Sequence, residues 1–164
     1  MQGIVLQVNI SPGGLPKYPI QEAIVTPFGI EGDSCAHPEV HGGPEKALLI
    51  VCSEVIEELK ERGHPLFAGA LGENLTTAGL DRRQLRTGQQ FRVGSAFIEL
   101  TRIRRPCSSL NAIGSGLQTE LFDAEVKAGD TRSPRWGMSG FYARVLRPGT
   151  VRPNDIIQLV GQVV

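Results

Sequence analysis

One cysteine stands where a reactive thiol could be made. Cys107 follows Arg104, Arg105 and Pro106 in the stretch ELTRIRRPCSSLNAIG, where an apolar alternation of residues stops. A free thiol has a pKa near ~8.5, and nearby cations or a helix beginning at Ser108 would stabilise the thiolate. The arrangement favours a nucleophile or a soft metal ligand. A half-buried structural cysteine with its arginines in solvent explains the spacing equally well, so both interpretations stay open.

The other two cysteines have different sequence surroundings. Cys52 ends the apolar run LLIVC, which is typical of a core position. Cys35, His37 and His41 form C-x-H-x3-H in a polar loop, which is part of a zinc pattern. A structural zinc ion needs four ligands and no second Cys/His pair has a suitable spacing, so we do not expect zinc. Three widely spaced cysteines favour free thiols in a reducing cytoplasm over a disulfide framework, and we expect a cytoplasmic protein.

Two glycine-containing loops could supply a surface for an anion. In HGGPEKA, residues 41–47, the glycines let backbone amides approach an anion, and Lys46 adds charge. The spacing of a phosphate-binding P-loop is missing. The second loop is GALGENL (residues 69–75). Its side chains Glu73 and Asn74 could form hydrogen bonds with neighbouring loops or face a ligand. Alone, each motif is also typical of an ordinary turn.

Composition narrows the classes of function. The 164 residues include 17 basic and 17 acidic side chains, so no overall field favours nucleic acid or a membrane surface. No apolar run reaches the ~20 residues that span a bilayer, and the N-terminal residues are typical of a first strand rather than a signal peptide. We expect one domain over residues 1–164, large enough to bury a core without disulfides or a structural metal.

The elements that must position these residues are mostly strands. Apolar patterns between Gly- and Pro-rich turns predict strands at 3–10, 22–26, 47–52, 91–93, 96–101, 140–146 and 156–160. A helix is predicted at 54–62, with Ser53 as its N-cap, and another at 119–127. Because strands and helices do not alternate regularly, we expect a mainly β protein, a closed or nearly closed barrel with a few short flanking helices.

Taken in chain order, the motifs resemble a known family. They are GIEGD (29–33), HGGPEKA (41–47), LGENL (71–75), GQQFRVGSAFIELTRIRRPC (88–107) and GFYARVLRPGTVRPNDIIQL (140–159). Together they closely resemble the MOSC domain, which is named for the C-terminal part of molybdenum cofactor sulfurase. The resemblance covers about residues 3–159, and the chain is similar to a stand-alone bacterial MOSC protein. It implies a MOSC-type β-barrel with a few flanking short helices.

The resemblance also implies a site. The family cysteine in R-x-P-C matches Cys107, which would bind the molybdenum of a pterin cofactor or carry sulfur as a persulfide. The residues expected to hold or orient the cofactor are His41, Lys46, Asn74, Arg104 and Arg144. After the cysteine, this chain has Ser108 and Ser109 where the family usually has a lysine or an aromatic residue.

The implied function takes three forms. In the first, the chain binds the molybdenum–molybdopterin cofactor and reduces N-hydroxylated substrates or handles the cofactor, with Cys107 as metal ligand and catalytic residue. In the second, Cys107 is a persulfide sulfur carrier. In the third, the chain is a ligand-binding adaptor without catalysis. The sequence contains no PLP-dependent desulfurase domain and no flavin, nicotinamide or iron–sulfur motif. We therefore expect a separate electron-transfer protein or a PLP-dependent cysteine desulfurase as partner, and the oligomeric state stays open.

Overall fold

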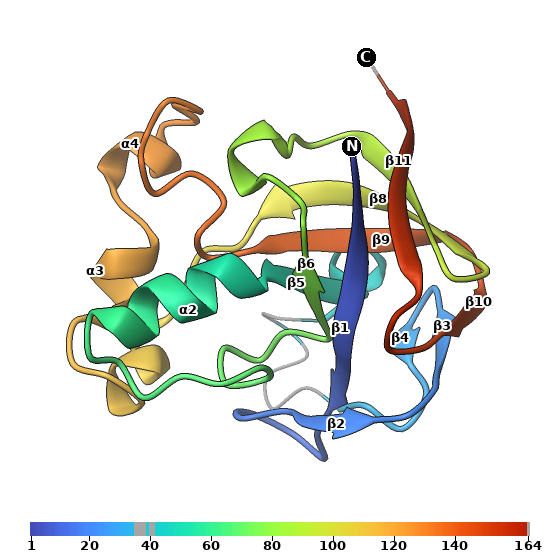
Figure 1. Ribbon diagram of the computed structural model, residues 1–164, viewed down its shortest axis with the longest axis horizontal. Helices are drawn as coiled ribbons and strands as arrows, with labels where there is room; N and C mark the ends of the chain where they lie inside the picture. Colours follow the sequence, from blue (N-terminus) through green and yellow to red (C-terminus); the bar gives the residue numbers. More distant parts are fainter. Residues whose placement is uncertain (35–38, 40–41, 164) are drawn as a thin grey trace.

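Seven strands close into a barrel in the computed structural model, which describes residues 1–34, 39 and 42–163 (Figure 1). Around the barrel the strands are β11 (Ile156–Gln162), β7 (Gln89–Val93), β8 (Ala96–Ile103), β9 (Phe141–Arg147), β5 (Leu48–Cys52), β6 (Leu75–Ala78) and β1 (Gln2–Ile10). Pairing of β1 with β11 closes the ring. Neighbouring strands are antiparallel except β5 and β6, which are parallel. The expectation of a mainly β barrel is confirmed.

Smaller elements surround the barrel on two sides. β2 (Tyr18–Ile20) extends the sheet beside β1, and a second sheet contains β10 (Gly149–Val151), β3 (Ala23–Thr26) and β4 (Gly29–Ile30). The α-helices of the described residues are α2 (Ser53–Glu61), α3 (Leu117–Leu121) and α4 (Ala124–Lys127), and they lie on the side of the barrel away from the second sheet (Figure 1). Short 3-10 helices form three connections: η1 (Pro44–Lys46), η2 (Arg82–Gln84) and η3 (Ser108–Ala112). No helix within 1–34, 39 and 42–163 is long and apolar enough to cross a membrane.

Apolar side chains of strands and helices share one core. On β8 the alternate residues Ala96, Ile98 and Leu100 are buried, as a strand with one face on the core requires. β5 is buried along its whole length. The helix predicted at 54–62 is α2, which packs beside β5 and β6 and buries Val55 and Leu59 with their neighbour Ile56.

Two local predictions are wrong. The helix predicted at 119–127 is divided into α3 and α4, because Phe122 is extended (φ −157°, ψ 132°). Asp123 then begins α4 by accepting a hydrogen bond from the Val126 amide at 2.8 Å. The N-cap of α2 is Cys52 rather than Ser53, and no side chain caps that end. Apolar spacing alone therefore located the helical regions but not their ends.

Candidate functional site

A cavity of about 440 Å³ lies beside Cys107. Its walls come from the β1–β2 loop, the β3–β4 hairpin, η1, the loop before β6 and the segment from Arg104 to η3. Lys46 of η1 and Asn74 of the loop before β6 line it, as does Tyr142. Small-molecule sites in proteins typically occupy roughly 300–1,000 Å³, so the cavity is large enough for a ligand. The fold thus brings four of the expected site residues to one place.

Cys107 presents a partly exposed thiol to this cavity. It lies just after β8 and is the N-cap of η3. Its Sγ is 2.6 Å from Oγ of Ser109. Burial opposes a charge on this sulfur, but hydrogen bonds from the Ser109 hydroxyl and amide and the charge of Arg104 outweigh it, so the pKa of the Cys107 thiol is lowered. The thiolate is the form that binds metals and attacks electrophiles, so the surroundings favour a reactive sulfur.

Arg104 places a buried positive charge next to the thiol. The residue is only 4% exposed, and its Nε and Nη1 have no hydrogen-bond partner in the part of the chain that the structure describes. Burial lowers the pKa of its guanidinium, while the charges of Tyr142, Cys107 and Glu73 oppose that shift. Buried donors without acceptors are costly, and guanidinium groups bind phosphate and carboxylate strongly. Arg104 therefore has the character of an anion-binding residue.

The two arginines before Cys107 have opposite positions. Arg104 is buried and lines the cavity, whereas Arg105 is exposed. The oxygen of Arg104 accepts a hydrogen bond from the Ser139 hydroxyl at 2.7 Å, which fixes the backbone there. The interpretation that both arginines lie in solvent is therefore wrong for Arg104.

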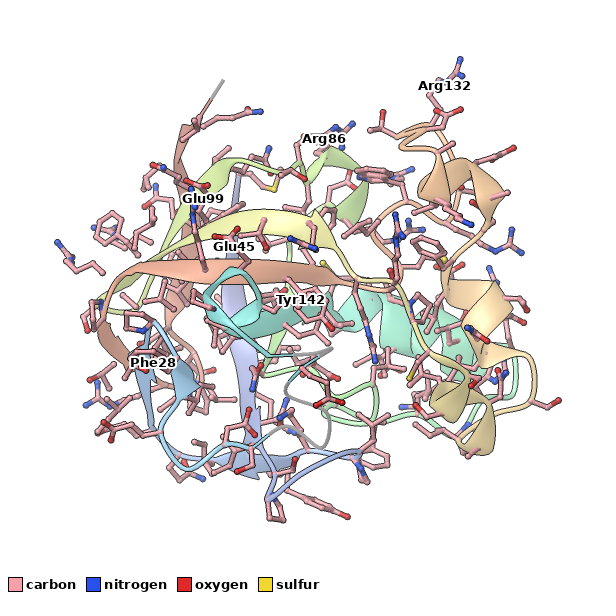
Figure 2. All side chains as sticks on the ribbon, turned by 180° about the vertical axis from the view of Figure 1, so that it is seen from behind. Phe28, Glu45, Arg86, Glu99, Arg132 and Tyr142 are labelled. Carbon is pink, nitrogen blue, oxygen red and sulfur yellow. The ribbon has the colours of Figure 1, made fainter. Side chains whose placement is uncertain are left out.

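Lys46 is another cation that lines the cavity. It ends η1, and the turn before η1 requires Gly43, whose φ is +100°. The Nζ of Lys46 lies 5.4 Å from the centre of the Tyr142 ring, a cation–π distance. Tyr142 belongs to β9 and is labelled in Figure 2. The HGGPEKA motif thus brings a charged side chain to the site through backbone geometry.

Asn74 joins the walls of the cavity. Its side-chain oxygen accepts a hydrogen bond from the Leu49 amide at 3.0 Å, and its Nδ2 donates to Asp33 at 2.8 Å and to the oxygen of Asn9 at 3.3 Å. Asp33 is also ion-paired with Lys17 at 2.6 Å. Asn74 therefore connects the segments that form the cavity wall. Lys17 and Asp33 also belong to this network, although the sequence did not predict a role for them. The GIEGD motif was the only signal for Asp33.

Glu73, the neighbour of Asn74, is fully buried. Its Oε1 accepts hydrogen bonds from the Gly69 amide at 2.6 Å and from the Thr76 hydroxyl at 2.8 Å. Burial raises the pKa of this carboxyl, and the charge of Arg104 acts in the opposite direction. Glu73 therefore holds the loop that enters β6.

Arg144 lies outside the cavity lining, and its expected role in holding the cofactor stays a prediction. Its guanidinium is ion-paired with Glu99 at 2.6 Å and with Glu45 at 3.2 Å, and Arg144 is not among the residues that line the cavity. Figure 2 shows Glu45 and Glu99 near one another on the β8–β9 side of the barrel. The charge of Glu99 raises the pKa of Arg144. Arg144 instead ties η1 to the barrel.

The remaining expected residue, His41, lies outside the described residues. Cys35 and His37, which complete the partial zinc pattern, lie outside them as well. In the portion that is described, no three His, Cys, Asp or Glu residues are grouped as a metal site would require. Among the described residues, Cys107 is therefore the soft donor that faces the cavity.

Comparison with known proteins gives a consistent result. The MOSC domain family model matches residues 37–158. The chain is 32% identical over 157 residues to protein YiiM of Escherichia coli (strain K12), covering 93% of this chain and 66% of that protein. It is 33% identical over 153 residues to the uncharacterized protein YflK of Bacillus subtilis (strain 168), covering 91% and 64%. The chain thus spans slightly less than two thirds of these relatives.

Solved structures agree with the sequence comparison. The crystal structure of YiiM from Escherichia coli superposes with a TM-score of 0.70 at 28% identity, covering 99% of this chain and 71% of that one. YiiM from Geobacillus stearothermophilus gives a TM-score of 0.69 at 27% identity, covering 97% and 75%. The likeness therefore extends over the whole barrel and its flanking elements.

Proposed function

The chain belongs to the MOSC domain family, and we propose from this that it binds a molybdenum–molybdopterin cofactor in the cavity beside Cys107. There it would reduce N-hydroxylated substrates or handle the cofactor. The observation that carries the proposal is the buried Arg104, whose Nε and Nη1 have no partner among the described residues, next to the partly exposed thiol. A pterin phosphate is an anion, and molybdenum accepts thiolate sulfur. The residues therefore fit both ends of such a group.

Different residues of the chain would bind different parts of the cofactor. Cys107 would supply the thiolate ligand, while Arg104 and Lys46 would hold the anionic part. The network of Asn74 and Asp33 keeps the opposite wall in place. When bound, the cofactor supplies a metal centre that exchanges electrons with the substrate. A role for His41 in orienting the cofactor stays a prediction.

We also propose that a second protein supplies the electrons. The sequence contains no flavin, nicotinamide or iron–sulfur motif. The cofactor-loaded protein should therefore be inactive toward an amidoxime or an N-hydroxylated base with NADH alone, and active once an electron-transfer chain is added. Robust turnover with NADH alone would contradict this dependence.

Persulfide transfer is the second candidate, and the surroundings of Cys107 favour it. The lowered pKa gives this sulfur a larger thiolate fraction than an ordinary cysteine has at the same pH. The thiolate would attack the terminal sulfur of a persulfide on a PLP-dependent cysteine desulfurase. A persulfide forms on Cys107 while the donor cysteine leaves as a thiolate, so sulfur moves with no net gain or loss of electrons.

One experiment distinguishes cofactor binding, sulfur transfer and a non-catalytic adaptor role. The protein is purified from a host that makes the molybdenum cofactor, then analysed for molybdenum and, by mass spectrometry, for a persulfide on Cys107. Molybdenum near one atom per chain supports cofactor binding. A persulfide without molybdenum supports sulfur transfer, and neither, with an inert Cys107, supports a ligand-binding adaptor. A host that cannot make the cofactor provides the control.

A further inference from the structure

Phe28 is an aromatic side chain that lines the cavity and yet lies almost entirely in water. It occupies the turn between β3 and β4 and is 91% exposed (Figure 2). In the part of the chain that the structure describes, no aromatic or cation–π contact involves its ring. A single apolar side chain on a surface is ordinary, but a ring at the opening of a ligand-sized cavity is well placed to stack on a flat ligand.

The turn holds Phe28 in a defined place. Its amide donates a hydrogen bond to the hydroxyl oxygen of Thr26 at 3.1 Å, and that hydroxyl donates to the oxygen of Gly29 at 3.0 Å. Thr26 also pairs with Gly29 across the hairpin, and a Cβ at Gly29 would lie 3.1 Å from the oxygen of Ala47, the C-cap of η1. The turn therefore packs against the end of η1, and its backbone is ordered before a ligand arrives.

The cavity has a charged part and an apolar part. Arg104, which is only 4% exposed, lies at its buried end with the thiol of Cys107 nearby. The larger apolar side chains of the lining are Leu15, Phe28, Ile30, Leu49 and Ile113. Of these, Phe28 is the most exposed, so its ring marks the end of the cavity that is open to water. A cofactor held at the buried end leaves this open end for the substrate.

We propose that Phe28 is a specificity-determining residue that stacks on the ring of an N-hydroxylated substrate. The site would therefore prefer substrates whose N-hydroxylated group is attached to a flat ring over aliphatic ones. The inference rests on the proposed function, because that function supplies both the reacting group and the cofactor at the buried end. It concerns which substrates are bound, and it assigns Phe28 no part in holding the metal.

Two substrates with the same reacting group test the proposal. Benzamidoxime carries a phenyl ring where acetamidoxime carries a methyl group. Each is reduced to its amidine with release of water, and the two electrons come from an added electron-transfer chain while two protons come from solvent. With the cofactor-loaded protein, Phe28→Ala should lower kcat/KM for benzamidoxime by about two- to tenfold, mainly through KM. The values for acetamidoxime should stay unchanged.

Matched variants separate a ring contact from general effects. Phe28→Tyr keeps the ring and should behave like wild type, whereas Phe28→Leu keeps an apolar side chain without the ring and should behave like Phe28→Ala. Phe67 is a control because it is also an exposed phenylalanine and is absent from the cavity lining. Phe67→Ala should treat both substrates as wild type does. Because both side chains are exposed, neither change should impair folding.

A binding measurement makes the test independent of turnover. The dissociation constant of benzamidoxime is measured by ligand-observed NMR on the same preparations without an electron donor. We expect binding to wild type, weakened in Phe28→Ala by the same factor as KM. Binding that depends on Phe28 without any turnover would contradict the proposed reductase function and leave the ring contact standing.

Four results overturn the ring contact. They are a wild type that does not bind benzamidoxime, unchanged benzamidoxime values in Phe28→Ala, equal losses for both amidoximes, and loss of molybdenum from folded Phe28→Ala. Equal losses would place Phe28 at the docking site of the electron-transfer partner, and loss of molybdenum would place its ring on the cofactor. Normal turnover that does not depend on Phe28 would leave the proposed function intact.

Discussion

Cys107 and Cys52 occupy matching places in the chain, yet the protein gives their thiols opposite properties. Each lies at or just beyond the end of a barrel strand, and each is the N-cap of the helical segment that follows. Each also has an arginine whose charge lowers its pKa, Arg104 for Cys107 and Arg82 for Cys52. Burial nevertheless raises the pKa of Cys52 from 9.0 to about 12, whereas that of Cys107 is lowered.

The difference comes from hydrogen-bond donors and access to water. Cys52 is buried, and the donor to its sulfur among the described residues is the Thr77 hydroxyl at 4.0 Å. The nearby charge of Glu54 raises its pKa further. The guanidinium of Arg82 is engaged by the backbone oxygens of Trp136 and Pro134. A strand end and an arginine are therefore insufficient for a reactive thiol. The sulfur also needs exposure and a close donor.

The largest expected contrast is in alkylation. In folded protein at neutral pH, Cys107 should react with iodoacetamide more than about a hundredfold faster than Cys52, because Cys52 is protonated and shielded from the reagent. Peptide mass spectrometry over time measures both rates, and both cysteines should react in denaturant. Similar alkylation rates of Cys107 and Cys52 in the folded protein would show that their thiols do not differ as described.

The second largest contrast is expected in cofactor retention, between variants of Arg104 and variants of Arg105. Arg104→Ala should weaken cofactor retention by about 10- to 100-fold, since hydrogen bonds to charged groups contribute about 1.5–3 kcal/mol. Arg104→Lys should lie between this variant and wild type, because lysine keeps the charge but loses the planar fork. The exposed Arg105→Ala serves as control and should retain the cofactor.

Cofactor release during dialysis measures retention in these variants, with thermal unfolding recorded for each. Retention like that of wild type in folded Arg104→Ala removes Arg104 from the site. Equal losses in Arg104→Ala and Arg105→Ala would show that only general surface charge matters.

The last expected contrast, with the smallest change per pH unit, concerns alkaline stability. Between pH 9.0 and about 12 the unfolded chain loses the Cys52 proton while the folded chain keeps it, so the free energy of unfolding should fall as pH rises. The contribution of this group is at most about 1.4 kcal/mol per pH unit. Cys107 contributes in the opposite direction, because its lowered pKa stabilises the fold as pH rises toward 9.0.

Urea unfolding of wild type and Cys52→Ala over this pH range tests the sign. The slope of stability against pH should be less negative in Cys52→Ala. An unchanged slope would mean that Cys52 ionises as easily in the folded protein as in the unfolded chain.

Apolar patterns predicted the main strands because most of them place one face on the core and β5 is buried along its whole length. The predicted segments correspond to β1, β3, β5, β7, β8, β9 and β11. The short β2, β4, β6 and β10 were missed, since β2, β4 and β10 have only two or three residues and β6 (LTTA) has no clear apolar alternation. Their pairing depends on partners elsewhere in the chain.

The sequence predicted the cavity-lining residues that belong to recognisable motifs. It did not predict contacts that depend on how strands pair. Cys107, Arg104 and Lys46 line the cavity as expected. Arg144 does not, because pairing of β8 with β9 places Glu99 opposite it. The bond between Asn74 and Asp33 joins residues 41 positions apart, which no local pattern reveals.

The most direct test of the account compares the two cysteines in one experiment. Cys107→Ser and Cys52→Ser are purified from a cofactor-producing host, and the molybdenum-to-protein ratio is measured beside wild type. We predict that Cys107→Ser loses the metal with little change in stability, because its side chain is partly exposed. Cys52→Ser should keep the metal but lose about 1–3 kcal/mol of stability from a buried hydroxyl. Full molybdenum loading in Cys107→Ser would contradict the central claim.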